Sequence, residues 1–430
     1  MRYLTCLAAA LPIVITSPNA IAAIIGTSTA APPLTIDRIA QLPAAKRAAW
    51  IEYLQRSDRQ MAADRAALAG ELRRAGLEHP LTPPSGSSAR SLPLNRPPEW
   101  YGSAEAKRLA EIAASFQTPA GGWSKNLNMA DHPRRPGEHF APNNLSRFLS
   151  GGDFDAPRAP EWTYVGTLDN DATNTEIRFL AKVCAAQADE ADRFRAAVLR
   201  GIDYLLAAQY PNGGWPQVWP LQGGYHDAIT LNDGAMIQTM EVLADVAAGN
   251  APFAFVEAGT RRRAAAAVKR GIACILASQI VVNGRRTVWA QQHDMLTLTP
   301  VAARNYEPAA QSSSESAQVL LFLMGLPSPD KAEVTAIEDG VRWLKHTAIE
   351  GKEYSRGPDG RRLVDAPGAG PIWSRFYAVG TDQPVFGDRD RTIHDSVNEI
   401  SAERRNGYSW YNAAAKEALD RYAVWRTQPR

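Results

Sequence analysis

The sequence predicts an all-α fold, an (α/α) toroid in which paired helices form an incomplete α/α barrel with long polar loops at one end. Apolar residues recur at helical spacing along most of the 430 residues, with almost no strand pattern between them. Loops that contain Gly and Trp recur after helical segments. Four polar segments separate the predicted helices, and a ring of helices would gather them into one cleft.

The first 22 residues are typical of a secretory signal peptide. Arg2 precedes an apolar stretch, and the small residues Ala20 and Ala22 provide a cleavage site. No later run of residues is long and apolar enough to cross a bilayer. We therefore expect a secreted or periplasmic protein with no membrane span, and we predict a monomer.

Two segments separate the signal peptide from the main domain. Residues 36–78 carry apolar residues at helical spacing with charges between them, which predicts one or two amphipathic helices. Residues 79–98 are rich in Pro and Ser and predict a linker, because this composition cannot sustain a helix or a strand. The predicted catalytic toroid then occupies residues 99–430.

Helical periodicity predicts eight helices in the main domain. Their expected ranges are 104–115, 171–188, 191–209, 233–247, 260–278, 313–324, 330–346 and 411–426. The loops FQTPAGGWSKN (116–126) and QYPNGGWPQVWP (209–220) form a degenerate repeat, with a weaker copy at 405–412. Gly suits the turn at a helix end, and Trp either plugs the gap between helices or offers its face to a sugar.

The overall charge gives no preference for a polyanion. With 47 basic and 45 acidic residues, the formal net charge is +2. We therefore expect no binding to nucleic acid, and any anionic ligand has to meet local charge.

The first two polar segments place acidic residues at predicted helix starts. TLDNDATNTEI contains Asp169, Asn170 and Asp171, and ITLNDGAM contains Asn232 and Asp233. Helix capping is one explanation, since Asp and Asn accept hydrogen bonds from free amides there. The repeated pattern also fits a hard cation such as Ca²⁺, which prefers oxygen ligands and would separate two facing carboxylates. A third use of such a pair is the acid and base of a glycoside hydrolase.

The other two polar segments supply cations. Arg304 lies in PVAARNYEPAA, where a surface salt bridge is the simple explanation and a chemical role is the alternative. Arg389 lies in FGDRDRTIHD, downstream of Arg375 in WSRFY. Alternating Asp and Arg usually forms exposed ion pairs, but the surrounding aromatic residues favour partial burial. An arginine held by an aspartate is suited to bind a carboxylate through two parallel hydrogen bonds.

Seven motifs occur together in an order and spacing typical of one known family. They are GGWSKN, TLDNDATNTEI, YPNGGWPQ, the ITLNDGAM run, WAQQHD, the ARNYEPA run and the F-x-DRD segment. Over roughly residues 100–411 the sequence resembles the pectate lyases of polysaccharide lyase family ten. The resemblance implies an (α/α) toroidal fold, a requirement for Ca²⁺, and anti β-elimination in (1→4)-α-D-galacturonan (polygalacturonate) to give unsaturated oligogalacturonates.

The resemblance also implies roles for individual residues. Arg304 matches the catalytic base, and Asp169 and Asp233 match the metal-binding acids. Arg389 matches an arginine that pairs with a substrate carboxylate. Three further substrate-binding positions in the same cleft are Asn170, Lys125 and Arg375. Residues 36–94 match no part of the family pattern.

An arginine base conflicts with the ordinary pKa of the guanidinium group, which is about 12 or higher. We expect burial near Ca²⁺ and Arg389 to disfavour the charged form of Arg304 and to produce an alkaline optimum. A rate that is flat or highest in mild acid would make Arg304 a substrate clamp, with His293 as the second choice of base. The alternatives to a lyase are a glycoside hydrolase on an α/α toroid using Asp169 and Asp233, and a non-catalytic secreted polysaccharide-binding protein.

Overall fold

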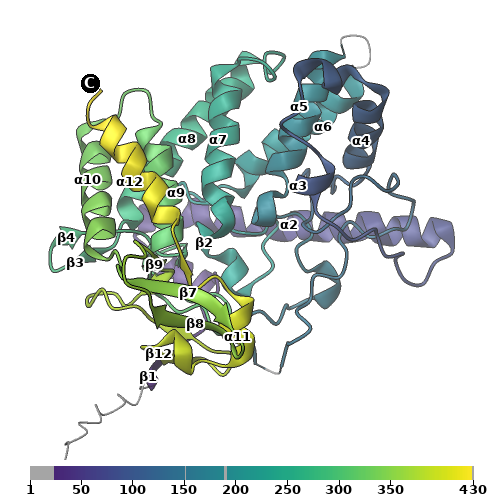
Figure 1. The fold of residues 1–430 in the computed structure, drawn as a ribbon. Helices are drawn as coiled ribbons and strands as arrows, with labels where there is room; N and C mark the ends of the chain where they lie inside the picture. Colours follow the sequence, from purple (N-terminus) through teal and green to yellow (C-terminus); the bar gives the residue numbers. More distant parts are fainter. Residues whose placement is uncertain (1–23, 151, 188–190, 429–430) are drawn as a thin grey trace, which may run out of the picture.

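The structure, a computed structural model, describes residues 24–150, 152–187 and 191–428, so the predicted signal peptide lies outside the described residues. A group of helices stands on one side of a layer of loops and short strands (Figure 1). Within the described ranges, no helix has both the length and the apolar character that a membrane span needs.

Eight helices form the upper group, and the predicted range of each is correct to within three residues. They are α4 (Ala104–Ser115), α5 (Asn174–Ala186), α6 (Ala191–Ala208), α7 (Ala235–Ala248), α8 (Ala258–Ser278), α9 (Ser313–Met324), α10 (Lys331–His346) and α12 (Ala414–Trp425). α5 packs on α6, α7 on α8, and α9 on both α10 and α12. Periodicity locates these helices because each buries one apolar face; α7, for example, buries Met236, Met240 and Leu243.

Each Gly-Trp loop is tied to the helix before it by the same hydrogen bond, from the Trp indole nitrogen to a backbone carbonyl oxygen. Trp123 Nε1 donates to Ala113 O at 2.6 Å, and Trp215 Nε1 donates to Leu205 O at 2.8 Å. Trp289 Nε1 likewise donates to Ile275 O of the preceding helix, at 2.7 Å. The loop that carries Trp289 is therefore a further copy of the repeat, which the sequence pattern did not reveal. All three indole rings are fully buried. They therefore plug the helix ends, and the alternative of a sugar-stacking face is wrong for them.

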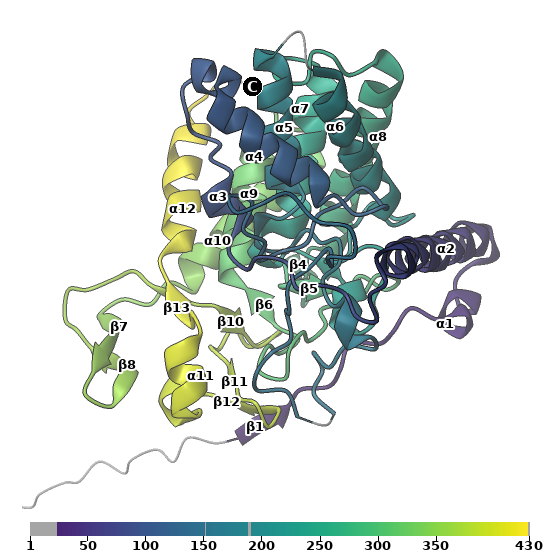
Figure 2. The same ribbon diagram turned by 90° about the vertical axis from the view of Figure 1, so that its right-hand side faces the viewer.

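The prediction of an all-α (α/α) toroid is wrong. Strands make up 12% of the chain beside 46% helix, and the helical pairs stand next to one another without forming a clear ring (Figures 1 and 2). Most of the strands are only two or three residues long, so they leave no alternating pattern in the sequence. The longest pair, β7 (Lys352–Gly357) and β8 (Gly360–Asp365), forms an antiparallel hairpin.

The remaining strands form small antiparallel sheets within the loop layer. One sheet has three strands in the order β1 (Ile24–Thr27), β12 (Thr392–His394) and β11 (Phe386–Gly387). The two-stranded pairs are β2 (Ile229–Thr230) with β5 (Gln292–His293), β3 (Val281–Val282) with β4 (Arg285–Arg286), β10 (Phe376–Tyr377) with β6 (Gln311–Ser312), and β13 (Tyr411–Asn412) with β9 (Trp373–Ser374). These sheets carry segments of the polar loops.

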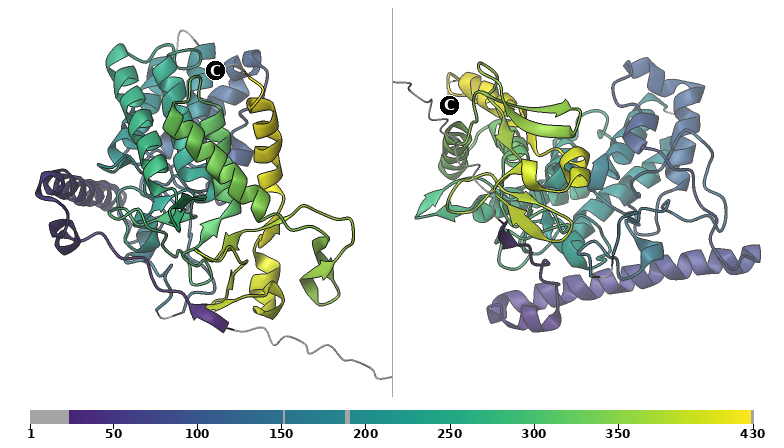
Figure 3. Two further views of the ribbon diagram at one scale, coloured as in Figure 1. Left: turned by 90° about the vertical axis from the view of Figure 1, so that its left-hand side faces the viewer. Right: turned by 60° about the horizontal axis from the view of Figure 1, so that its bottom comes forward.

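The N-terminal segment lies beside the helical group. After β1 it forms α1 (Ile36–Ala40) and the long helix α2 (Ala44–Ala75), which crosses one side of the molecule (Figures 2 and 3). Tyr53 of α2 packs on Tyr210 with ring centroids 4.7 Å apart, and its hydroxyl donates to Ala208 O. The Pro/Ser-rich stretch that follows is largely irregular, but it contains the short helix α3 (Ser88–Ser91). The domain boundaries themselves remain a prediction.

Candidate active site

The polar segments contribute to one pocket of about 110 Å³ beside the N-terminal ends of α5 and α7. Its lining residues are Lys125, Tyr164, Asp169, Asn170, Gln217, Tyr225, Asn232, Asp233, Gln291, Gln292, Arg304 and Glu307. Five of the seven predicted site residues are therefore together in this pocket. Arg375 and Arg389 are not among its lining residues.

Two short 3₁₀ turns, η3 (Asp169–Asp171) and η5 (Asn232–Gly234), bring the acidic residues to the pocket and contact each other. The backbone is left-handed at Asn170 (φ 52°) and Asp233 (φ 50°). Thr173 also has a positive φ, which is rare for a β-branched residue. Its hydroxyl holds this turn by donating to Thr167 O at 2.8 Å and accepting from Trp123 N at 2.9 Å.

Asp169 is buried and is held by polar side chains. It accepts hydrogen bonds from Lys125 Nζ at 2.6 Å and from Gln217 Nε2 at 3.0 Å. Burial acts to raise the pKa of Asp169, but the Lys125 ammonium and the hydrogen bonds outweigh it and the pKa lies below its usual value. α5 begins after Thr173 without a side-chain cap. Asp169 therefore does not cap the helix, and its carboxylate is available to the pocket.

Asp233 lies beside Asp169, within hydrogen-bonding reach of it. Its side chain reaches solvent through the pocket, although protein atoms surround most of the carboxylate. Burial there, followed by the charge of Asp169, raises the pKa of Asp233 to about 7. Two adjacent carboxylates of this kind share a proton or a cation, because both cannot remain charged without one.

Arg304 forms a two-point ion pair with Glu307. Its Nε donates to Glu307 Oε2 at 2.8 Å, and its Nη2 donates to Glu307 Oε1 at 2.6 Å. Burial acts to lower the pKa of Arg304, but Glu307 outweighs it and raises the pKa well above the usual value. Among the protein groups around Arg304, burial therefore does not disfavour the charged form, contrary to the expectation. No described residue accepts a hydrogen bond from Nη1, which leaves this nitrogen available for a ligand.

The other two predicted arginines flank the pocket. Arg375 lies behind it, where its Nη2 donates to Asn232 Oδ1 at 2.7 Å and pairs with Glu315. Arg389 lies to one side, and its Nε and Nη2 donate to Glu403 at 2.8 and 3.2 Å. Both arginines are held by Glu residues distant in sequence, which the alternating Asp and Arg pattern could not indicate.

The structure gives His293 a structural role. The ring is fully buried, its Nδ1 lies 2.9 Å from Leu298 O, and its Nε2 accepts from Ala290 N at 3.0 Å. Burial lowers the pKa of His293 to about 4, so the ring is neutral. Both ring nitrogens are occupied, and neither is available as a base.

Sequence reasoning gave no role to several residues of the pocket. Glu307 holds Arg304, and Gln217 holds Asp169. Tyr164 lies under Lys125, with Nζ 3.4 Å from the ring centroid. Glu307 lies in the ARNYEPA run together with Arg304, so this motif could have indicated a role for Glu307.

The oxygen atoms of the pocket fit a hard cation such as Ca²⁺. Asp169 and Asp233 supply adjacent carboxylates, and the buried Oε1 atoms of Gln217 and Gln291 have no hydrogen-bond partner. Within the described part of the chain no cluster of three or more His, Cys, Asp or Glu residues could hold a metal. A cation bound here would therefore need neutral oxygens, water or ligand carboxylates to complete its coordination.

Comparison with known proteins shows the family of this chain. Residues 117–419 match the family model described as pectic acid lyase. The structure is similar to a family 10 polysaccharide lyase from Cellvibrio cellulosa, with a TM-score of 0.64 and 32% identity over 79% of this chain and 98% of that one. It is equally similar to a mutant of that lyase in complex with trigalacturonic acid, of which 100% is covered. The comparison with curated proteins found no match. The chain thus belongs to the pectic acid lyase family and is a polysaccharide lyase.

Proposed function

We propose that the protein is a Ca²⁺-dependent pectate lyase that cleaves polygalacturonate by anti β-elimination and releases unsaturated oligogalacturonates. The observation that carries the proposal is the composition of the 110 Å³ pocket, where the carboxylates of Asp169 and Asp233 face the cations of Lys125 and Arg304. The trigalacturonic acid bound by the Cellvibrio cellulosa mutant supports the same class of substrate.

The pocket provides what β-elimination requires. The leaving proton of a galacturonate ring lies next to a carboxylate, and it becomes acidic only when that negative charge is neutralised. Ca²⁺ bound at Asp169 and Asp233 would supply positive charge to the substrate carboxylate. Lys125 holds Asp169 in place for this role. Arg375 and Arg389 flank the pocket, each paired with a glutamate. Asn170, which is exposed at the rim, is available to bind the sugar.

We assign the base to Arg304, through Nη1. This nitrogen points away from the ion pair, whereas Nε and Nη2 are occupied by Glu307. Glu307 opposes loss of the proton from Arg304, so the neutral form becomes more abundant only as the pH rises. An alkaline optimum follows from this arrangement.

The hydrolase alternative fits the pocket less well. The two carboxyl groups of a glycoside hydrolase are separated by about 5 Å or more, to leave room for a sugar bond and a water molecule. Asp169 and Asp233 lie within hydrogen-bonding reach of each other, which suits a shared cation better. A non-catalytic binding role fits less well with the match to the pectic acid lyase family.

The test is product formation from polygalacturonate, followed by the ultraviolet absorbance of the unsaturated product. We expect activity with Ca²⁺, loss in EDTA, and a decrease of about 100-fold or more for Arg304→Ala. Arg262→Ala, which removes an exposed arginine of α8, is the matched control and should retain full activity. Reducing ends without that absorbance would instead support the hydrolase, and retention of the polymer without any product would support a binding protein.

A further inference from the structure

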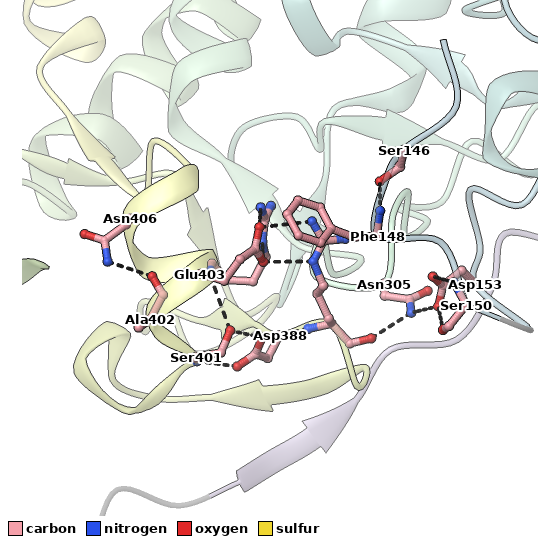
Figure 4. A network of polar contacts seen from close by, with 12 residues as sticks. Ser146, Phe148, Ser150, Asp153, Asn305, Asp388, Ser401, Ala402, Glu403 and Asn406 are labelled. Carbon is pink, nitrogen blue, oxygen red and sulfur yellow. Dashed lines mark hydrogen bonds and ion pairs between the residues drawn. The ribbon is translucent and has the colours of Figure 1, made fainter. Parts of the chain in front are cut away.

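Phe148 is an exposed aromatic side chain beside the candidate active site. It is 41% exposed, whereas most large aromatic residues of this protein are buried. It lies in the loop that includes Ser146 and Ser150, and Figure 4 shows the loop facing Glu403 and Asn305. The ring packs against two arginine side chains, but a large part of it stays open to solvent.

Phe148 belongs to a row of alternating arginine and aromatic side chains that starts at Arg304. The guanidinium carbons of Arg304 and Arg389 lie 5.0 and 5.4 Å from the centroid of the Tyr306 ring. Arg389 also lies 4.4 Å from the centroid of Phe148, and Arg147 lies 4.8 Å from the same ring. The row therefore leads from the pocket to the surface, and it ends at Phe148 and Arg147.

Two of these arginines have donors available for a ligand. Glu403 occupies Nε and Nη2 of Arg389, and no described residue accepts from its Nη1. Arg147 is exposed and forms no ion pair with a carboxylate in the described ranges. The charge of Arg147 and the open Nη1 donor of Arg389, next to an exposed aromatic ring, suit an anionic sugar.

Asn305 fastens this loop next to Arg304. Its Nδ2 donates to Asp153 Oδ1 and to Arg389 O, both at 2.7 Å, and its Oδ1 accepts from Phe154 N at 3.0 Å. The buried amide thus joins the loop, the Arg304 segment and the Arg389 segment (Figure 4). These contacts anchor Asp153 and Phe154, which follow Phe148 in the chain, next to Arg304 and Arg389.

We propose that Phe148 and Arg147 form an additional subsite, which binds a galacturonate unit of the polymer beyond the units held at Arg304 and Arg389. The apolar C–H face of the sugar stacks on the Phe148 ring, and its carboxylate pairs with Arg147. Polygalacturonate carries one carboxylate on every ring, and Arg147 and the Nη1 of Arg389 offer donors to such carboxylates on either side of the exposed Phe148 ring. This subsite rests on the proposed pectate lyase function.

The test compares Phe148→Ala, Phe148→Leu, Phe148→Trp and Arg147→Ala with the wild-type enzyme on polygalacturonate and on trigalacturonate. For Phe148→Ala and Arg147→Ala we expect KM for the polymer to increase about two- to tenfold, with kcat nearly unchanged. The increase should be smaller on the trimer, which is too short to fill all subsites. Phe148→Leu keeps an apolar side chain without a ring and should resemble Phe148→Ala, whereas Phe148→Trp should retain the affinity. Arg262→Ala controls for the loss of one exposed positive charge.

Retention on a gel that contains polygalacturonate gives a second readout, which does not depend on turnover. An unchanged KM and unchanged retention for Phe148→Ala would overturn the subsite, as would a decrease in kcat alone, since Phe148 would then only hold Arg389 in position. Equal effects on the polymer and the trimer would also overturn it. If the wild-type enzyme retains the polymer but forms no unsaturated product, while Phe148→Ala loses retention, the proposed reaction fails and the subsite stands.

Discussion

Glu307→Gln removes the negative charge that faces Arg304 and keeps the size of the side chain. Burial acts to raise the pKa of Glu307, but the Arg304 guanidinium outweighs it and lowers the pKa from 4.5 to about 2. A difference of this size between the folded and unfolded pKa corresponds to about 3 kcal/mol of folding free energy. The Glu307 side chain is 2% exposed and that of Arg304 is 35% exposed, so solvent screens the interaction only in part, and about 3 kcal/mol is an upper value.

The sign of the pH dependence follows from the lowered pKa. The carboxylate of Glu307 stabilises the fold above the unfolded pKa of 4.5, and this contribution is lost as the pH falls towards 2. We therefore expect Glu307→Gln to unfold with about 3 kcal/mol less free energy than the wild type at pH 7, and the difference to shrink below pH 4.5. Urea unfolding, followed by Trp fluorescence at pH 7, 4.5 and about 3, measures this difference.

Glu353→Gln, on the exposed side of β7, is the matched control and should have no measurable effect. A stability difference between the Glu307→Gln variant and the wild type that is absent at pH 7, or that persists undiminished at pH 3, would refute the reasoning. The same variant also tests the base, because it removes the group that keeps Arg304 charged. We expect the alkaline rise in activity to move to lower pH, and an unchanged pH profile would argue against Arg304 as the base.

Three further predictions concern single side chains. Lys125→Met should decrease the rate of unsaturated product formation by about tenfold or more, because Asp169 loses the ammonium that holds it. Asp64→Asn should raise the free energy of urea unfolding by about 2 to 3 kcal/mol at pH 8 and little at pH 4. Burial raises the pKa of Asp64 from 3.8 to about 6, so the cost of its ionisation grows as the pH rises between these two values. Gly213→Ala should lower Tm and destabilise the fold by about 2 kcal/mol or more, because φ is +96° and a methyl group there would overlap Arg270 O; an unchanged Tm would contradict the geometry.

The helices could be predicted from the sequence because their signal is local and extends over several turns. α4 and α9 were predicted at their observed bounds, since each buries one continuous apolar face. The two-residue strands β9 and β10 could not be predicted, because their hydrogen-bond partners lie far away in the sequence. The hairpin of β7 and β8 had an available signal in the Gly-Pro-Asp-Gly sequence at residues 357–360, a typical turn composition.

The site was predicted in part, for a similar reason. Repeated acidic motifs indicated Asp169 and Asp233, and a resemblance indicated Arg304. The partners that set their charge states could not be derived, because an ion pair such as Arg304 with Glu307 depends on the direction of the side chains in an irregular loop. The position of Arg389 beside Phe148 depends on a fold that joins residues more than two hundred positions apart.

The strand and long helix at the beginning of the described chain determine how far the protein can be shortened. The family match begins at residue 117, but β1 is an edge strand of the sheet that contains β12, just after Arg389. An engineered version starting at residue 117 would expose the open side of β12 and the aromatic surface that α2 covers at Tyr210. Such a truncated protein should aggregate, and recombinant production should begin no later than residue 24.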